Sequence, residues 1–314
     1  MIEILRNKPL IINADLDGII SGLLLSKYIN CAIVGFSNSN KEIWLRQDFN
    51  KELKSICFLD LFVVNPEIVS IDQHIIAGNQ THFKELSKNP NKINPNLFNP
   101  RFHQPSKSYR LKYPFGTVHF IIALLEKNGI DLSEIKLQKE LQGIKFMDLL
   151  LRADDCMKTS IYSSYTSNAE EWWAWLYSYS IKGKTIAACK GYLDNLSKKD
   201  AEQIKRKLSR FMKNAPYNCD SSDGGIDQLT TNGFIKENVF QLVELLCNLI
   251  EEPVFKLGGL YKKFTGIAER TTLSDTQLTE LILKGTIDKK RVFSYAFVRT
   301  AEREEYFSVT FYQN

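Results

Sequence analysis

Two aspartates separated by a single residue stand out near the N-terminus, in the stretch NADLDG at residues 13–18. They follow an apolar, strand-like run and precede an apolar, helix-like run from Ile19 to Tyr28. Positions i and i+2 of a strand share a face, so Asp15 and Asp17 are expected to point toward one place beyond the strand end. Two carboxylates that close repel each other unless a cation lies between them. Oxygen ligands favour a hard ion such as Mg²⁺ or Mn²⁺, although the same spacing also occurs in plain turns.

The first half of the chain alternates short apolar runs with helical patterns and predicts an α/β fold. Strand-like runs lie at residues 9–13, 31–36, 56–63 and 67–75, and residues 42–55 are interpreted as a polar connection or helix. Continuous apolar strands separated by helical segments predict a parallel sheet with helices on both faces. Ligands of such sheets bind outside the carboxyl ends of the strands. Asp60 and Asp72 join Asp15 and Asp17 near those predicted ends.

The rest of the chain predicts a long loop, several helices and a closing hairpin. Residues 84–114 are rich in Asn, Pro and Lys and are interpreted as a loop, followed by a helix that ends at Asn128-Gly129. The segment 141–159 is apolar and ends in the acids Asp154 and Asp155. Further helices are expected at 167–180, 197–215, 238–252 and 271–285, with a hairpin formed by 291–300 and 305–313. Ser167 or Asn168 is the expected cap of its helix. The expected division is a parallel-sheet domain at 1–163 and a smaller mixed α+β domain at 164–314.

Composition indicates a globular protein of the cytoplasm. The 314 residues are 44% hydrophobic and 25% charged, and no apolar run approaches the ~20 residues that span a bilayer. The N-terminus is too short and too mixed for a signal peptide. Six cysteines without a C-x-x-C pair indicate reduced thiols rather than disulfides or a zinc site. A net charge of +5 permits an anionic substrate.

The order of the acidic blocks resembles the DHH phosphoesterase superfamily, in particular its RecJ-type exonucleases and small oligonucleotidases. The matching stretches, within residues 8–160, are NADLDGIISGLL, FLDL, SIDQHI, FNPR with YPFGTVHFIIALL, and RADD. The resemblance implies a parallel-sheet domain with a two-metal site that uses Mn²⁺ or Mg²⁺ to hydrolyse a nucleic-acid end or a short oligonucleotide. The glycine-rich signature of the DHH-associated C-terminal domain is not evident. Neither SSDGGID (221–227) nor FKLGGLYKKFTG (255–266) is equated with it.

The resemblance also implies a role for each residue of these blocks. The acids that correspond to metal ligands of the family are Asp15, Asp17, Asp60 and Asp154. Asp60 corresponds to the ligand that bridges both metals, and Asp155 replaces Asp154 if the register shifts by one. Asp72 would orient the third block, and His74 would face the substrate phosphate. Substrate contacts are expected from Asn99, Arg101 and Gly116, because an arginine beside the metals can bind a phosphate bidentately.

Two positions depart from the family pattern and leave two functions open. Asn13 stands where the family has His or Asp, and Gln73 stands where it has the first His of Asp-His-His. Both amide oxygens can ligate a hard cation, but without charge. The chain is therefore interpreted either as an active phosphodiesterase or as a catalytically silent module that binds nucleic acid or a partner protein as a structural subunit. A small-molecule phosphatase such as a pyrophosphatase is less favoured, because no basic phosphate-binding motif is found.

Other notable side chains have plain structural interpretations. His119 is expected in the core, and His82 and His103 in solvated loops, with His103 close to Arg101. Trp172, Trp173 and Trp175 are expected to be buried by a helix rather than to stack bases. The basic run Lys198–Lys213 is interpreted as a solvated helix face rather than a contact for nucleic-acid phosphates. Oligomeric state stays open.

Overall fold

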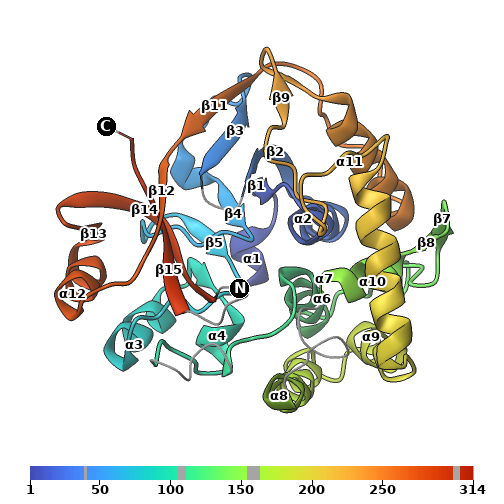
Figure 1. Ribbon diagram of the computed structural model, residues 1–314, viewed down its shortest axis with the longest axis horizontal. Helices are drawn as coiled ribbons and strands as arrows, with labels where there is room; N and C mark the ends of the chain where they lie inside the picture. The colour runs from blue at the N-terminus through green and yellow to red at the C-terminus, as the bar shows by residue number, and fades with distance from the viewer. Residues whose placement is uncertain (39–40, 105–110, 154–162, 300–304, 314) are drawn as a thin grey trace.

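A seven-stranded sheet in the order β11-β3-β2-β1-β4-β5-β6 forms the centre of the molecule (Figure 1). The computed structural model describes residues 1–38, 41–104, 111–153, 163–299 and 305–313. The run β2-β1-β4-β5-β6 is parallel, whereas β3 and β11 extend the sheet antiparallel at one edge. The strands are β1 (Pro9–Asn13), β2 (Ala32–Ser37), β3 (Glu42–Arg46), β4 (Cys57–Leu59), β5 (Val69–Ile71), β6 (Lys92–Ile93) and β11 (Tyr261–Thr265). The expected α/β class with a parallel sheet is thus confirmed.

Most of the helices cover one face of this sheet. Leu10 and Ile12 of β1 join them in the main hydrophobic core, and Figure 1 shows α6 to α11 gathered on that side. The helices are α1 (Ile2–Leu5), α2 (Leu16–Ile29), α6 (Thr117–Lys127), α7 (Phe146–Ala153), α8 (Ser163–Tyr179), α9 (Lys184–Asp194), α10 (Lys198–Lys213) and α11 (Glu237–Ile250). Ile11 faces the opposite side, where the extended segment after β4 and Phe293 form a separate small core. Helices on both faces were expected; extended chain replaces them on this second face.

Three local expectations are corrected. Residues 42–55 form strand β3 and a 3-10 turn, η1 (Leu53–Ser55), because Ile43, Trp44 and Leu45 pack into the cores on the two faces of the sheet while β3 pairs with β2 and β11. Within 84–114 the chain forms β6 and α4 (Pro95–Phe98) after α3 (Gln80–Lys88), rather than one long loop. Helix α8 begins at Ser163, so the expected cap positions lie inside it, and Asn168 donates to the Lys112 carbonyl instead.

A four-stranded antiparallel sheet follows at the C-terminal end of the chain, in the order β12-β15-β14-β13. Its elements are β12 (Ile267–Thr271), α12 (Asp275–Lys284), β13 (Thr286–Ile287), β14 (Lys290–Arg299) and β15 (Glu305–Phe311). β14 pairs with β15 as the expected hairpin, and Tyr295 and Phe307 belong to a core of their own. Two further hairpins join β7 (Glu140–Leu141) to β8 (Ile144–Lys145) and β9 (Thr230–Thr231) to β10 (Phe234–Ile235).

The hydrophobic core does not break at the expected domain boundary of 163/164. Trp172 of α8 and Leu242 of α11 share one core with Leu10 of β1, and β11 completes the first sheet. The C-terminal sheet is the part with its own core, and it lies on the opposite side of the central sheet from α10 (Figure 1).

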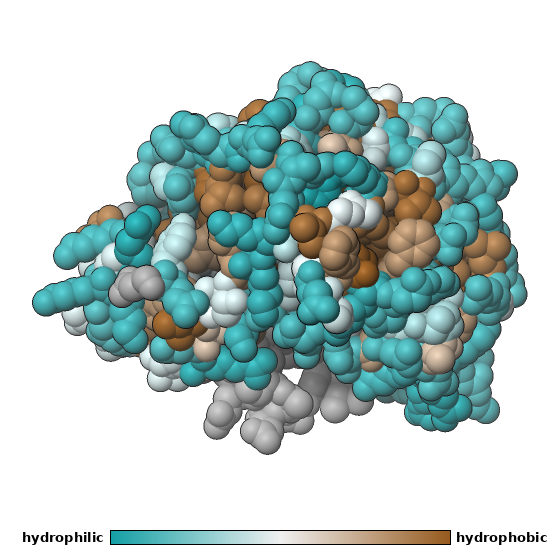
Figure 2. Space-filling view, turned by 90° about the horizontal axis from the view of Figure 1, so that it is seen from above, coloured by the Kyte–Doolittle hydropathy of each residue, from teal (hydrophilic) through white to brown (hydrophobic). Residues whose placement is uncertain are grey.

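The surface of the protein is mostly hydrophilic on the face shown in Figure 2. Seen from above in Figure 2, hydrophilic side chains surround separate apolar patches rather than one continuous apolar surface. Among the described residues, the cysteines Cys31, Cys57, Cys189, Cys219 and Cys247 are free and buried. Across the described ranges, no helix is both long and apolar enough to cross a membrane.

Candidate metal and phosphate site

The strand order reverses at β1, and this switch point positions the candidate site. The chain leaves β1 through α2 to reach β2 on one side, whereas β4 and β5 lie on the other side. In parallel sheets the crevice at such a point, beyond the carboxyl ends of the strands, is the usual ligand site. Asn13 ends β1, Asp60 follows β4, and Asp72 follows β5. The strand ends therefore bring together residues that are far apart in the sequence.

A cavity of about 290 Å³ opens at this crevice, between the strand ends and the C-terminal sheet. Its lining is acidic on one side and small and neutral on the other. The lining residues are Asn13, Asp15, Leu16, Asp17, Asp60, Leu61, Phe62, Asp72, Gln73, His74, Asp223, Ser294, Tyr295, Ala296, Val298 and Ser308. No lysine or arginine of the described residues belongs to it. Asp154 and its alternative Asp155 lie outside the described residues.

Asp15 is the N-cap of helix α2. Its Oδ1 accepts a hydrogen bond of 2.9 Å from the Gly18 amide, and its Oδ2 accepts one of 2.6 Å from the Asn13 side chain. The same Asn13 Nδ2 donates to Asp60 at 3.1 Å. The amide of Asn13 thus bridges two carboxylates. Asp15 and Asp17 both line the cavity, as expected, but the strand geometry assumed for them is wrong, because the chain turns into α2 immediately after Ala14.

Asp17 is held by the first turn of helix α6. Its carboxylate accepts hydrogen bonds from the backbone amides of Thr117 at 2.7 Å and Val118 at 2.8 Å. The positive end of the helix dipole favours a carboxylate at this position. Gly116 permits the approach, since a Cβ there would lie 2.8 Å from the Asp17 oxygens. Gly116 therefore contacts Asp17, which lines the cavity, but Gly116 does not line the cavity itself.

Asp60 lies in a left-handed backbone conformation, with φ of 62°. This conformation is uncommon for residues other than glycine and is found at functional sites. The Asp60 amide donates to the Ile71 carbonyl at 2.8 Å, which ties the turn to the end of β5. The Asp60 carboxylate accepts a hydrogen bond of 2.6 Å from the Thr117 hydroxyl.

Asp72 and His74 form a rigid pair at the end of β5. The Asp72 carboxylate interacts with His74 Nδ1 at 2.9 Å and accepts from the His74 amide at 3.2 Å. Asn94 and Asn96 donate to the carbonyls of this turn and fix its backbone. The Oε1 atom of Gln73 is buried in the cavity wall and has no hydrogen-bond partner in the described part of the chain.

The acids of the cavity raise one another's pKa values. Burial, and then the charge of Asp60, raise the pKa of Asp15 well above its usual range, and the same two causes act on Asp17. Burial and the charge of Asp72 raise the pKa of Asp60 to about 6. Burial opposes charge on His74, but the charge and hydrogen bond of Asp72 raise its pKa above the usual value. A cation in the cavity would relieve the repulsion among the acids.

The donor chemistry fits a hard divalent cation, although the donors are not gathered for one. Among the described residues, no group of three or more His, Cys, Asp or Glu side chains is placed to hold a metal ion as it stands. The reason lies in the contacts above: Asp17 faces α6, and the Asn13 amide occupies the space between Asp15 and Asp60. The oxygen-only set and the unpartnered Gln73 Oε1 are nevertheless the kind of ligands that Mg²⁺ and Mn²⁺ take.

Two of the expected substrate residues lie away from the cavity. Arg101 donates to the Leu111 carbonyl at 2.9 Å and to Asn99 at 3.3 Å, and its guanidinium packs over the Trp172 ring. Neither Arg101 nor Asn99 lines the cavity. Their contacts are structural, because they hold the segment after α4 against α8.

The histidines outside the site have structural surroundings. His119 is fully buried beside Phe115 and Trp173, as expected for a core residue. His82 is not a solvated loop residue: it is buried in α3, and its Nδ1 accepts from the Gly78 amide at 3.2 Å. His103 stacks on Phe297 with ring centroids 4.1 Å apart.

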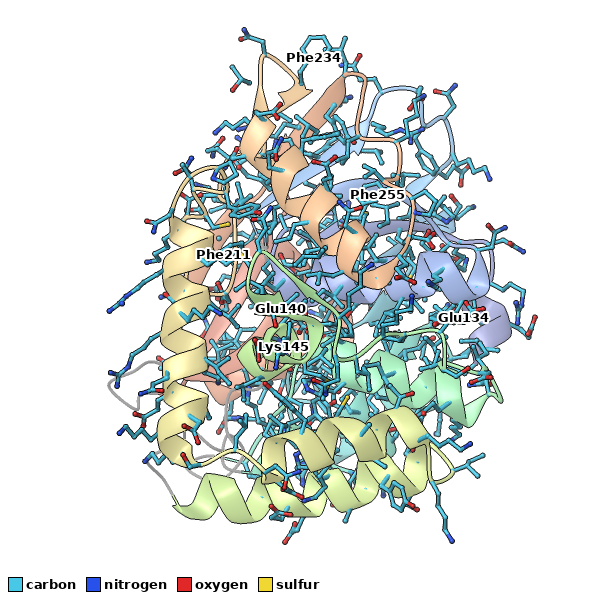
Figure 3. The ribbon with its side chains drawn as sticks, turned by 90° about the vertical axis from the view of Figure 1, so that its right-hand side faces the viewer. Glu134, Glu140, Lys145, Phe211, Phe234 and Phe255 are labelled. Carbon is cyan, nitrogen blue, oxygen red and sulfur yellow. The ribbon has the colours of Figure 1, made fainter. Side chains whose placement is uncertain are left out.

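The aromatic and basic candidates also lie outside the cavity lining. Trp172 and Trp173 are fully buried, which confirms the expectation of packed aromatics. Helix α10 buries Ala201, Leu208 and Met212 and turns its basic residues outward. Figure 3 shows α10 along the edge of the molecule, beside the β7–β8 hairpin that carries Glu140 and Lys145. Lys207 donates to the Gly143 carbonyl of that hairpin, consistent with a surface helix.

The cavity residues that the sequence analysis missed include one acid, Asp223, and two serines, Ser294 and Ser308. Asp223 lies in the SSDGGID turn, which reaches the site because the Leu16 amide donates to the Asp223 carbonyl and the Ile226 amide to the Ala14 carbonyl. The Asp-Gly-Gly turn was the available signal. Ser294 and Ser308 come from the closing hairpin, whose alternation predicts a shared face but not what that face covers.

Comparisons with family models, with curated proteins and with solved structures gave no match.

Proposed function

We propose that this chain is a Mn²⁺- or Mg²⁺-dependent phosphodiesterase that hydrolyses a nucleic-acid end or a short oligonucleotide. The observation that carries the proposal is the meeting of Asp15, Asp17, Asp60 and Asp72 with His74 in one cavity at the switch point of the sheet. This meeting supports the proposal, because three of the blocks that resemble those of the DHH superfamily, NADLDG, FLDL and SIDQHI, contribute residues to the cavity. The free thiols support a location in the cytoplasm.

The residues that would hold the cations are Asp15, Asp60, Asp72 and Gln73, with Asn13 turned so that its oxygen faces the ion. When bound, such cations supply positive charge for the phosphate and make a water molecule more acidic. Thr117 and the first turn of α6 keep Asp60 and Asp17 in place. The Asp72 carboxylate orients the His74 ring by accepting from Nδ1, so Nε2 can donate to a phosphate oxygen when the ring carries a proton on both nitrogens.

One observation favours the rival function, a silent module that binds nucleic acid or a partner protein. The Asn13 amide already bridges Asp15 and Asp60, and its two N–H···O contacts relieve part of their repulsion without a metal. A protein that had lost its cation would be expected to fill the space in this way.

Cleavage of a short single-stranded oligonucleotide in the presence of Mn²⁺ separates the two functions. The Asp60→Asn substitution keeps the side-chain shape and removes one charge. We expect the wild type to cleave, and Asp60→Asn to lose at least about a hundredfold in rate while it remains folded. Binding of the same oligonucleotide is measured in chelator for both proteins.

The silent module would give a different pattern. The wild type would not cleave DNA, RNA or cyclic dinucleotides with Mn²⁺, and Asp60→Asn would bind as well as the wild type or better, because repulsion of the phosphate falls. That combination would overturn the proposed hydrolase.

A further inference from the structure

The hydroxyl of Ser294 is a buried polar group without a hydrogen-bond partner among the described residues. Its side chain is 1% exposed, and it lines the candidate cavity from the C-terminal sheet. A hydroxyl left unpaired in this way lowers stability, because it loses its contacts with water and gains none in return. Because the hydroxyl lies on a cavity wall, a ligand bound in the cavity could supply the missing hydrogen-bond partner.

A β-bulge places Ser294 on that wall. The register between β14 and β15 shifts between Val292 and Ser294. Val292 and Tyr295 therefore both belong to the core of the C-terminal sheet, although Tyr295 also borders the cavity, whereas Ser294 and Ala296 line the cavity and lie outside that core. Without the extra residue, the alternation of the strand would put Val292 and Ser294 on the same face. Bulges commonly re-aim a side chain next to an active site.

Ser294 is also fixed relative to the acids on the opposite wall. Ser294 forms an isolated bridge with Val63, and the Val64 amide donates to the Phe293 carbonyl at 2.8 Å. Further along β14, the Tyr295 hydroxyl donates to the Ile76 carbonyl at 2.7 Å. These contacts reach the two segments that follow Asp60 and His74, so the wall cannot move independently of the site.

The wall around Ser294 is uncharged, and apart from Tyr295 its side chains are small. Ala296, Val298 and Ser308 share it, and Ser308 lies directly across the hairpin from Ala296. A phosphate is expected on the other side of the cavity, where the acids, any bound cation and His74 lie. The neutral part of the substrate then faces the serine wall. A cavity of about 290 Å³ has the volume of about ten waters at ~30 Å³ each, which suits a single nucleotide.

We propose that Ser294 determines sugar specificity by hydrogen bonding the ribose 2′-hydroxyl of the terminal nucleotide, so that the site prefers ribonucleotides to deoxyribonucleotides. This inference rests on the proposed function for the side of the cavity that holds the phosphate. A hydroxyl can both donate to and accept from another hydroxyl. A site built around such a contact discriminates against the analogue that lacks it, because the protein group is again left unpaired.

Binding of three probes in the presence of Mn²⁺ tests the inference without relying on catalysis. The probes are adenosine 5′-monophosphate, 2′-deoxyadenosine 5′-monophosphate and inorganic phosphate, titrated into the full chain. Ser294→Ala is the test variant. Ser70→Ala is the matched control, since Ser70 is also buried and unpartnered among the described residues but does not line the cavity. Thermal unfolding should show both variants at least as stable as the wild type, because each loses an unpaired hydroxyl.

We expect the wild type and Ser70→Ala to bind the ribonucleotide about three- to tenfold more tightly than the deoxyribonucleotide, as one neutral hydrogen bond allows. Ser294→Ala should bind the two equally and bind inorganic phosphate as the wild type does. Equal binding of both nucleotides by the wild type, or an unchanged preference in Ser294→Ala, would overturn the inference. So would weaker phosphate binding by Ser294→Ala, which would assign the hydroxyl to the phosphate. A preference without any oligonucleotide cleavage would leave this inference standing and remove the proposed hydrolase.

Discussion

The hydroxyl of Thr117 donates a hydrogen bond of 2.6 Å to Asp60, although the two residues are 57 positions apart in the chain. The backbone amide of the same threonine donates to Asp17 at 2.7 Å. One residue at the start of α6 therefore sets the positions of two acids that come from the ends of different strands. The site depends on how α6 packs as much as on the strands themselves.

Substitutions at Thr117 should separate its shape from its hydrogen bond. Thr117→Val keeps the volume but leaves Asp60 without the hydroxyl donor, whereas Thr117→Ser keeps the donor. We expect Thr117→Val to lose about tenfold or more in Mn²⁺ affinity, as is usual when a ligand loses its supporting contact. Thr117→Ser should bind within a few-fold of the wild type. Equal affinities for the two variants in calorimetric titrations would show that Asp60 does not need this contact.

A carboxylate in place of the Asn13 amide should make the fold dependent on a cation. Asn13→Asp removes two N–H contacts to Asp15 and Asp60 and adds a third charge. In chelator we expect the free energy of unfolding to fall by about 2 kcal/mol, the usual loss for hydrogen bonds to charged groups. Mn²⁺ should then stabilise this variant more than it stabilises the wild type. Asn99→Asp, away from the cavity, serves as the control; a similar response of both variants to Mn²⁺ would contradict the expectation.

The sequence predicted the strand ends better than the walls of the site. Asp15, Asp60 and Asp72 follow continuous apolar strands, and such strands place their ends at one edge of a parallel sheet. The role of β11 could not be predicted, because its polar residues gain a partner only when the chain returns to β3.

The cavity wall that contains Ser294 could not be predicted from the sequence pattern either. Alternation along 291–300 gives two faces, but the bulge after Val292 changes which residues share a face, and a bulge has no sequence signal of its own here. The turn of the chain into α2 likewise decided the direction of Asp17, which a strand pattern could not show.

Replacement of His119 should stabilise the protein. Its ring is fully buried, and neither ring nitrogen has a hydrogen-bond partner in the described part of the chain. Leucine has a similar volume and no polar atoms, so His119→Leu should gain about 1 kcal/mol in urea unfolding at pH 7. His82→Leu is the contrast, because it leaves the Gly78 amide unpaired and should lose stability. Destabilisation of both variants would contradict this account of His119.

The gain from His119→Leu should grow in acid. Burial lowers the pKa of His119 to about 4, below the unfolded value of 6.5. Between these values the unfolded chain binds more protons, so wild-type stability falls as pH decreases, by up to about 1.4 kcal/mol per pH unit. Leucine does not titrate. The difference between variant and wild type should therefore widen from pH 6.5 to pH 4, and a constant difference would show that the ring is charged in the fold.

Lys92 should produce a pH dependence of the same direction in a more alkaline window. Its ammonium is buried and donates to the carbonyls of Val63, Asn65 and Ile68 at 2.6–2.8 Å. Burial lowers its pKa from 10.5 to about 7. Between pH 7 and 10.5 the unfolded chain binds more protons, so the stability of the wild type relative to Lys92→Met should rise with pH in that window, by at most about 1.4 kcal/mol per unit. No change between pH 7 and 9 in urea unfolding would mean that the three carbonyls keep the ammonium charged.

Calorimetric titration of Mn²⁺ into the full-length chain tests the central claim, that the acids at the switch point hold a divalent cation. Asp60→Asn is the test variant. Asp148→Asn is the control, since Asp148 is also buried but lies on α7 and bonds to Tyr192 and the Lys145 amide. The account predicts that the wild type and Asp148→Asn bind at least one Mn²⁺ and that Asp60→Asn binds about tenfold more weakly or not at all. Absence of Mn²⁺ binding by the wild type, or equal binding by Asp60→Asn, would contradict it.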